Sequence, residues 1–326
     1  MCGMMASTCA RCPPPLNADP FSIAVPIRPG SPAAWLVALR LRSLPVAVSP
    51  VLVGAALGWQ RTGSIDTITA LVILAAALLI QIVTNLQNDV GYTARGGERD
   101  GTRIGLPRAT ANGSLSVRSV RIAIVAVAAL AVALGVMLML ARGWPVLAIG
   151  AASLTAALAY MGGSRPIAYT PFGEATVFVF FGLVAVMGTD WVLTGGLAPV
   201  TLVASVAIGG LAAAALAVNN HRDVEHDRRV GRRTFAVTFG PRASRALVAL
   251  LLLAPFALVP LMAVFAGAPA LLLPLLRLPA AIRLRREFEH CSPGLAMNAV
   301  LFRTFRMELA FAALLSIGAV VDRMVA

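Results

Sequence analysis

The chain has 326 residues, of which 59% are hydrophobic and only 13% are charged, and its mean hydropathy is +0.84. A soluble domain is about 45–50% apolar and about a quarter charged, so this composition excludes an ordinary soluble protein. The net charge of +13 comes from arginine alone, because the sequence contains no lysine. The arginines lie in short segments between apolar runs, so we interpret them as topological signals or as ligands for an anion, and not as a nucleic-acid surface.

The N-terminal segment contains three consecutive prolines at 13–15 and no long apolar run of the kind found in signal peptides. Cys9 and Cys12 form a lone C-x-x-C pair without a second half-site, which predicts neither a zinc site nor a disulfide framework. We therefore expect residues 1–33 to be a disordered cytoplasmic tail and residues 34–326 to be a single transmembrane domain.

Apolar residues gather into blocks of about 17–25 residues, the length that crosses a bilayer as a helix. They predict an all-α integral membrane protein with about nine transmembrane helices. The expected spans are 34–59, 66–88, 118–141, 145–161, 172–193, 199–219, 244–266, 268–284 and 304–321. Pro45 and Pro50 are expected to kink the first span, and Pro269, Pro274 and Arg277 to make the eighth irregular.

The interhelical segments alternate between arginine-rich and arginine-poor along the chain. By the positive-inside rule, the N-terminus and the arginine-rich loops are cytoplasmic, and the C-terminus faces outward. This alternation supports the count of nine spans, since one missed span would disrupt it. We expect a multi-pass protein of a bacterial inner (plasma) membrane.

Two clusters of acids and amides each close an apolar run. The first is Asn85, Asn88 and Asp89, and the second is Asn219, Asp223 and Asp227. If each helix continues through its cluster, the spacing places the members of each cluster on one face. Four predicted helices separate the clusters, which indicates two pseudo-repeated four-helix units plus one further helix, with a site shared between the halves.

Carboxylate and amide oxygens suit Mg²⁺, which takes one or two carboxylates and completes its shell with water and substrate phosphates. Nearby guanidinium groups suit a pyrophosphate, which they bind through paired hydrogen bonds. The candidate arginines are Arg103, Arg108, Arg165, Arg222 and Arg228. The alternative for each arginine is a solvated ion pair, which contributes little. His221 and His226, without cysteines beside them, are interpreted as loop residues and not as zinc ligands.

Both clusters also resemble known motifs. Residues 85–96 (NLQNDVGYTARG) and 103–113 (RIGLPRATANG) are similar to the first motif region of the UbiA-type intramembrane prenyltransferases. Residues 219–240 resemble the second motif, most closely in the branch that acts on 1,4-dihydroxy-2-naphthoate in menaquinone biosynthesis. The chain departs from the family at Tyr92, where a second Asp is usual, and at Gly96, where a third acid is common.

The resemblance implies Mg²⁺-dependent transfer of a polyprenyl group from its diphosphate to an aromatic ring carbon, with loss of CO₂ in the naphthoate branch. The expected metal ligands are Asn88, Asp89, Asp223 and Asp227. The expected catalytic residues are Asn85, Asp89, Asp223, Asp227 and Tyr160. The expected pyrophosphate ligands are Arg103, Arg108, Arg165, Arg222 and Asn219.

Two alternatives stay open at this stage. The chain could be a member of the same family with another acceptor, such as 4-hydroxybenzoate, or a membrane transporter, since carriers also contain intramembrane polar groups and repeats. A transporter would place its charges at mid-membrane, whereas these clusters lie at helix ends. The prenyl chain length, the acceptor and the oligomeric state are not determined by the sequence.

Overall fold

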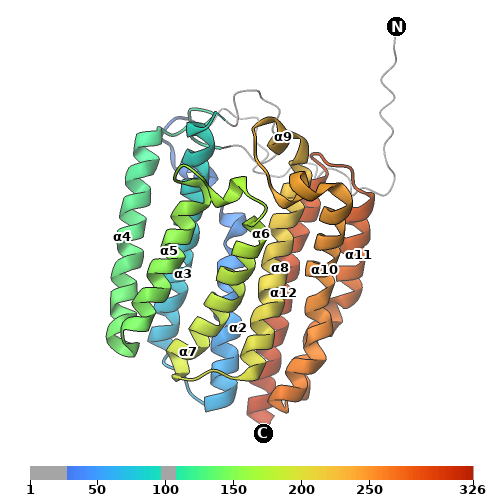
Figure 1. Cartoon of the computed structure of the whole chain (residues 1–326). Helices are drawn as coiled ribbons and strands as arrows, with labels where there is room; N and C mark the ends of the chain where they lie inside the picture. Colours follow the sequence, from blue (N-terminus) through green and yellow to red (C-terminus); the bar gives the residue numbers. More distant parts are fainter. Residues whose placement is uncertain (1–27, 97–107, 326) are drawn as a thin grey trace.

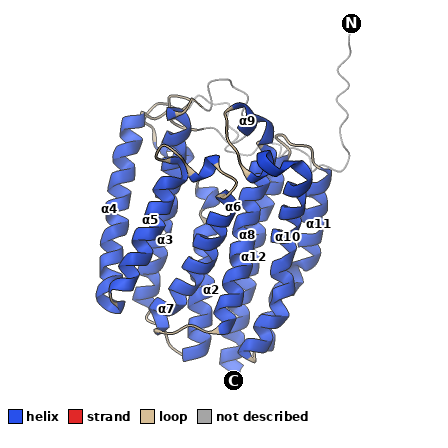
Figure 2. Cartoon of the chain, in the orientation of Figure 1, coloured by secondary structure: helices blue, strands red, loops and turns tan. Residues whose placement is uncertain are grey.

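The computed structural model describes residues 28–96 and 108–325, and every regular element in these ranges is helical (Figure 2). The α-helices are α1 (Pro32–Leu39), α2 (Pro45–Thr62), α3 (Thr67–Ala94), α4 (Val117–Arg142), α5 (Trp144–Met161), α6 (Gly173–Val177), α7 (Gly188–Thr194), α8 (Pro199–Arg222), α9 (Val224–Arg229), α10 (Phe235–Ala266), α11 (Leu278–His290) and α12 (Met297–Val325). Short 3₁₀ segments are η1 (Leu41–Ser43), η2 (Ile167–Tyr169) and η4 (Pro269–Arg277), and η3 (Phe178–Met187) is a π-helix. The expected tail, residues 1–33, lies mostly outside the described ranges.

The long helices lie side by side in one bundle, with α4 at one edge and α11 at the other (Figure 1). Within the described ranges, seven helices are long and apolar enough to cross a membrane, or eight if the bent pair of α1–η1 with α2 counts as one span. The fold class expected from the sequence, an all-α membrane protein, is confirmed. The count of nine is not, because the eighth expected span falls on η4 and the start of α11, where Pro274, Arg277 and Arg283 interrupt the apolar run.

The first span is broken between Arg40 and Pro45, so the kink expected at Pro45 is present where the second part of the span begins. Arg40 adopts a left-handed conformation (φ 50°, ψ 54°) and ends α1 by donating its backbone N–H to the Leu36 carbonyl, and the chain then bends by 46° into α2. Pro45 occupies the first turn of α2, where a missing N–H leaves no helical bond unmade, while Pro50 lies inside α2. The bend brings Arg40 to the wall of the bundle's interior.

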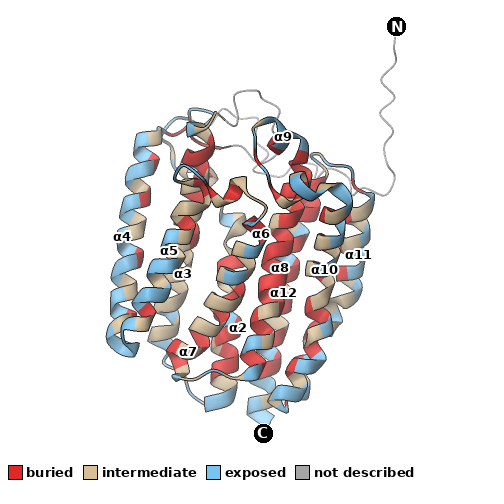
Figure 3. Cartoon of the chain, in the orientation of Figure 1, coloured by how far each residue is buried: buried red, intermediate tan, exposed pale blue. Residues whose placement is uncertain are grey.

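Helix α8 is the most buried of the spanning helices (Figure 3). Its small residues allow close approach: a Cβ added at Gly209 would lie 2.6 Å from the Phe178 carbonyl oxygen of η3. On α2, a Cβ added at Gly54 would lie 2.5 Å from the Val186 carbonyl oxygen. These contacts fix α2, η3 and α8 against one another, as small residues do in membrane helix pairs.

The apolar core is divided into two large clusters. One joins α8, α10, α11 and α12, with parts of α2, and the other joins α1, α3, α4 and α5. The division leaves an interior space between the two groups of helices, and both polar motifs end beside it.

Candidate active site

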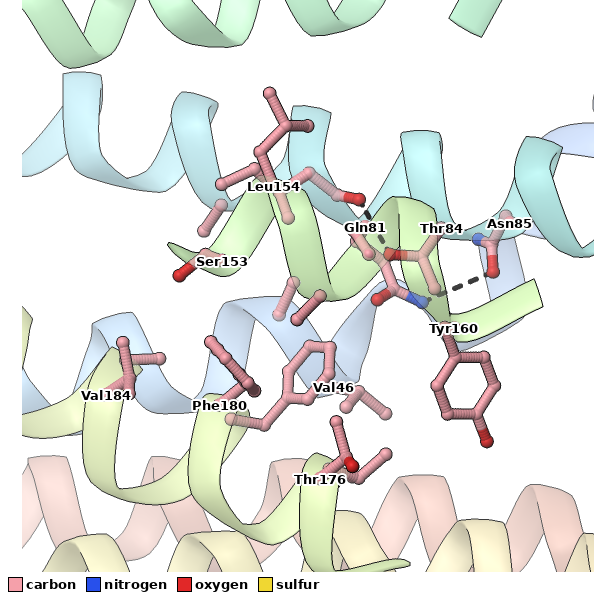
Figure 4. Close-up of a pocket in the computed structure, with 18 of the residues that line it drawn as sticks. Val46, Gln81, Thr84, Asn85, Ser153, Leu154, Tyr160, Thr176, Phe180 and Val184 are labelled. Carbon is pink, nitrogen blue, oxygen red and sulfur yellow. Dashed lines mark hydrogen bonds between the residues drawn. The ribbon is translucent and has the colours of Figure 1, made fainter. Parts of the chain in front are cut away.

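A cavity of about 730 Å³ lies between the two core clusters. Its wall follows α3 from Ile73 to Tyr92, which corresponds to about 28 Å of helix at 1.5 Å per residue. Thr176 and Phe180 face Gln81 across it (Figure 4). The volume lies within the range of small-molecule sites, and the length suits an extended chain.

The polar side chains of the cavity are concentrated where the C-terminal turns of α3 and α8 approach each other. The polar side chains at this end are Arg40, Ser43, Asn85, Asn88, Tyr92, Arg108, Tyr160, Asn219 and Arg232, whereas those farther along the wall are uncharged residues such as Gln81, Thr84 and Thr176. The other end is apolar and includes Leu138, Val146 and Val192. Every charged residue that lines the described cavity is an arginine, so this end attracts anions.

Asp89 is fully buried behind the cavity wall and does not line it. Its carboxylate accepts the backbone N–H groups of Ala109 and Thr110, at 3.0 and 2.8 Å, and a short hydrogen bond from the Thr110 hydroxyl. A carboxylate binds backbone N–H groups through strong, charge-assisted hydrogen bonds. Asp89 therefore fixes the segment that begins at Arg108 against the end of α3.

Asn85 connects α3 to the bend between α1 and α2. Its amide nitrogen donates to the Leu39 carbonyl at 2.9 Å and to Ser43 Oγ at 3.0 Å, and its oxygen accepts from Gln81 at 3.3 Å (Figure 4). These bonds hold the turn that contains Arg40. Asn85 thus positions one of the arginines of the cavity wall.

Arg232 is the centre of the second motif's contact with the first. Its guanidinium donates to Asp227 Oδ1 at 2.6 Å, to the Ala168 carbonyl at 3.0 Å and to the Tyr92 hydroxyl through a short hydrogen bond. Burial alone disfavours the charged form, but Tyr92 and Asp227 outweigh it and raise the pKa of Arg232 above its ordinary value. The guanidinium is therefore a permanent positive charge inside the protein.

Arg222 and Asp223 form a second buried ion pair, with two bonds of 2.8 and 2.7 Å between guanidinium and carboxylate. The same guanidinium donates to Asn219 Oδ1 at 2.8 Å and to Asn298 Oδ1 at 2.6 Å. These contacts join the end of α8 to the start of α12. They also bring Asn219 and Asp223 to one guanidinium, but α8 ends at Arg222 and Asp227 lies in the separate helix α9, so the continuous helix assumed for Asn219, Asp223 and Asp227 is not present.

Asn88 and Tyr160 both line the cavity, as expected for site residues. The Asn88 side-chain oxygen is buried and accepts no hydrogen bond from the described residues. Its backbone oxygen accepts from Arg108 Nη1 at 2.8 Å, which holds that guanidinium at the wall. The structure thus brings Asn85, Asn88, Arg108, Tyr160 and Asn219 to one end of one cavity.

Arg222 and Arg165, two predicted pyrophosphate ligands, do not line the cavity, and Arg222 is buried in its ion pair with Asp223. Arg165 is exposed in the loop between α5 and η2 and does not line the cavity. Arg95 holds that loop against α3 by donating to the Met161 carbonyl at 2.7 Å. Arg103 falls outside the described residues, so its predicted role stays a prediction.

Sequence reasoning missed the contact between Tyr92 and Arg232. Tyr92 was interpreted as the loss of an acid, and Arg232 as part of a motif ending. The available signal was the glycine before Arg232: Gly231 has a φ of 76°, and the turn returns the chain so that Arg232 N–H donates to the Asp227 carbonyl at 2.8 Å. Glu174 was also missed; it is buried and accepts from Asn220 Nδ2 at 2.9 Å.

Residues 47–305 match the UbiA prenyltransferase family. The chain belongs to this family. It is 35% identical to the 1,4-dihydroxy-2-naphthoate octaprenyltransferase of Escherichia coli, over 68% of this chain and 73% of the relative. It is 36% identical to the enzyme of the same name from Mycobacterium tuberculosis, over 66% of this chain and 73% of that one. Family membership makes the protein a multi-pass membrane prenyltransferase.

Solved structures of UbiA homologues share the fold. A homologue from Archaeoglobus fulgidus bound to DMAPP and Mg²⁺ superposes with a TM-score of 0.65 at 17% identity, covering 88% of this chain and 99% of that one. The apo structure of a homologue from Aeropyrum pernix gives a TM-score of 0.64 at 18% identity, over 86% and 97%. At this identity the likeness concerns the fold alone.

Proposed function

We propose that this UbiA-family prenyltransferase transfers a polyprenyl group from polyprenyl diphosphate to 1,4-dihydroxy-2-naphthoate in menaquinone biosynthesis. The observation that carries the proposal is the single cavity, arginine-lined at one end and apolar along the rest, that lies between the two motifs. Relatives named 1,4-dihydroxy-2-naphthoate octaprenyltransferase support this choice of acceptor. A diphosphate head fits the arginine end, and a prenyl chain fits the apolar remainder.

The diphosphate is held by Arg108 of the cavity wall, with Asn219 beside it and Arg222 bonded to Asn219 behind the wall. The C–O bond between the prenyl group and the diphosphate breaks, a C–C bond to the acceptor ring forms, and the acceptor's carboxyl group leaves as CO₂. Arginine donors compensate the charge that develops on the leaving diphosphate. The apolar cavity keeps water away from the allylic cation, and the ring of Tyr160 lies in its wall as a π surface for that cation.

The donor atoms present fit Mg²⁺ at the second motif. Asp223 and Asp227 supply carboxylates four residues apart in sequence, and Asn88 of the first motif adds a buried amide oxygen that accepts no hydrogen bond from the described residues. In the described part of the chain, no group of three or more His, Cys, Asp or Glu side chains could hold a metal ion, so the substrate would complete the shell. When bound, the ion supplies electrostatic stabilisation of the leaving diphosphate. UbiA homologues bound to DMAPP or GPP with Mg²⁺ support this assignment.

The bilayer is the medium of the reaction, since both the prenyl diphosphate and the product are lipids. The arginine-rich loops support an orientation with the motif end of the bundle in the cytoplasm of a bacterial inner membrane. In Figure 1 the α9 end of the bundle and the C-terminal end of α12 lie at opposite faces.

The deciding experiment supplies the purified full chain in nanodiscs with Mg²⁺, octaprenyl diphosphate and one acceptor at a time, with products identified by mass. We expect a decarboxylated prenyl naphthol product from 1,4-dihydroxy-2-naphthoate and none from 4-hydroxybenzoate. Product from hydroxybenzoate alone would reverse the choice of acceptor. Asp89→Ala, Asp223→Ala and Asp227→Ala should each abolish transfer in inserted protein, and near-normal turnover in all three would contradict the site assignment.

A further inference from the structure

Tyr92 connects two arginines that come from the two different motifs. Its hydroxyl accepts from Arg232, and its ring face lies against Arg108, whose guanidinium carbon is 3.5 Å from the ring centroid. Tyr92 itself is only 5% exposed and lines the cavity together with both arginines. Contact between a guanidinium and an aromatic face is favourable and strengthens when both groups are shielded from water.

The charges around this contact are unevenly distributed. Arg40, Arg108 and Arg232 line the described cavity, whereas the carboxylates of Asp89 and Asp227 lie behind its wall. Asp89 in particular directs both oxygens at the backbone of the following segment. An anion at this end therefore meets guanidinium groups first.

We propose that Tyr92 holds Arg108 and Arg232 together as a cradle that binds diphosphate directly, without a divalent cation at the first motif. In the described part of the first motif the acid does not fit a metal: Asp89 is engaged by three hydrogen bonds, and the position where a second acid is usual in the family carries a phenol. Mg²⁺ is then required only on the side of Asp223 and Asp227. That the natural diphosphate carries a prenyl chain rests on the proposed function.

The identity of residue 92 decides whether the site binds an anion directly through its arginines or through a bound cation. A tyrosine leaves both arginine charges directed toward the cavity and adds none of its own. An aspartate there would place a carboxylate against Arg232, compete with Asp227 and repel the diphosphate. A cation would then be needed to restore attraction. The substitution Tyr92→Asp should therefore convert diphosphate binding from metal-independent to metal-dependent.

The experiment measures binding of radiolabelled inorganic pyrophosphate to the purified full chain in nanodiscs, once in EDTA and once in Mg²⁺. We expect the wild-type protein to bind in EDTA with a Kd within about tenfold of its value in Mg²⁺, since the cation contributes at one side only. Tyr92→Phe, which keeps the ring and loses one hydrogen bond, should weaken binding in EDTA by roughly 3- to 10-fold. Tyr92→Asp should lose binding in EDTA and regain it in Mg²⁺.

Arg121→Gln is the matched control, because this exposed residue of α4 lies away from the cavity and its loss removes one positive charge. It should bind pyrophosphate as the wild type does. Thermal unfolding checks that each variant is folded, and if Tyr92→Asp is not, Tyr92→Phe decides. Wild-type binding that disappears in EDTA, or equal binding by Tyr92→Phe and the wild type, would overturn the cradle.

The two proposals fail in different ways. If the protein binds pyrophosphate in EDTA but transfers no prenyl group to any acceptor, the proposed function is wrong and the cradle stands. If prenyl transfer proceeds but pyrophosphate binding requires Mg²⁺, the cradle is wrong and the proposed function stands. Electron paramagnetic resonance with Mn²⁺ gives a third readout: one bound ion per chain with pyrophosphate in the wild type, and two in Tyr92→Asp.

Discussion

The acids of the two motifs follow similar apolar helices but are held by different partners. Asp89 accepts hydrogen bonds from the backbone of the next segment, whereas Asp223 and Asp227 are paired with the guanidinium groups of Arg222 and Arg232. The first motif uses its acid to position a loop, and the second uses its acids to balance buried cations. Residues of the same type at similar spacing thus serve different purposes.

The largest effect on stability is expected from Asp227→Ala. Removing it leaves the buried guanidinium of Arg232 without its carboxylate, and breaking a buried pair from one side costs about 3–5 kcal/mol. Thermal unfolding in nanodiscs measures the loss. The double variant Asp227→Ala with Arg232→Met should recover most of it, because no uncompensated charge remains. An unchanged unfolding temperature in the single variant would show that this pair does not stabilise the fold.

Asp89→Asn tests the first motif, in which backbone N–H groups and not a guanidinium bind the carboxylate. The amide cannot accept from both backbone N–H groups, and each unsatisfied buried donor costs about 1–3 kcal/mol. Hydrogen exchange followed by mass spectrometry should show faster exchange at Ala109 and Thr110, while the α8–α9 junction is unchanged. No arginine substitution should rescue this variant. Rescue by loss of Arg108 would mean that Asp89 acts as a counter-ion after all.

The sequence allowed the fold class to be predicted, because apolar blocks of bilayer length have few alternatives to helices. It also placed both clusters at helix ends, from which Asn85, Asn88 and Asn219 line one cavity while the three aspartates do not. The ion pairs could not be predicted, since they depend on turns such as the one at Gly231 that return the chain onto the preceding helix. The expected eighth span, and with it the count of nine, is not confirmed because η4 and α11 are helical in shape yet interrupted by prolines and arginines. Arg40 was missed as a cavity residue because its backbone conformation, and not its neighbours in sequence, brings it there.

Asp223→Ala is expected to have a smaller effect on stability than Asp227→Ala. Arg222 would keep its hydrogen bonds to Asn219 and Asn298, at 2.8 and 2.6 Å, so the guanidinium is still solvated by amide oxygens. We expect a loss of about 1–2 kcal/mol, less than for Arg232, which would keep one backbone carbonyl and one phenol hydroxyl, the latter a weaker acceptor than an amide oxygen. Prenyl transfer should nevertheless fall steeply, because Asp223 is a proposed metal ligand. Measuring both the unfolding temperature and the turnover at saturating Mg²⁺ separates the loss of stability from the loss of activity. A loss of stability as large as that of Asp227→Ala would contradict the expected difference between the two ion pairs.

The smallest effect on diphosphate binding is expected from Arg165, whose charge is not held in place by either motif. Arg165 is exposed and lies outside the cavity wall. Its contribution to diphosphate binding is therefore that of a solvated ion, about 0–1 kcal/mol. Arg165→Gln should raise the KM for prenyl diphosphate by less than about fivefold. Arg108→Gln removes a buried guanidinium of the wall itself and should cost far more. Salt distinguishes them further, because an exposed charge is screened and a buried one is not: the effect of Arg165→Gln should vanish at high ionic strength, while that of Arg108→Gln persists. If the effects of Arg165→Gln and Arg108→Gln on KM both vanish at high ionic strength, the two arginines act alike at a solvated surface. The distinction between the buried Arg108 of the cavity wall and the exposed Arg165 would then be wrong.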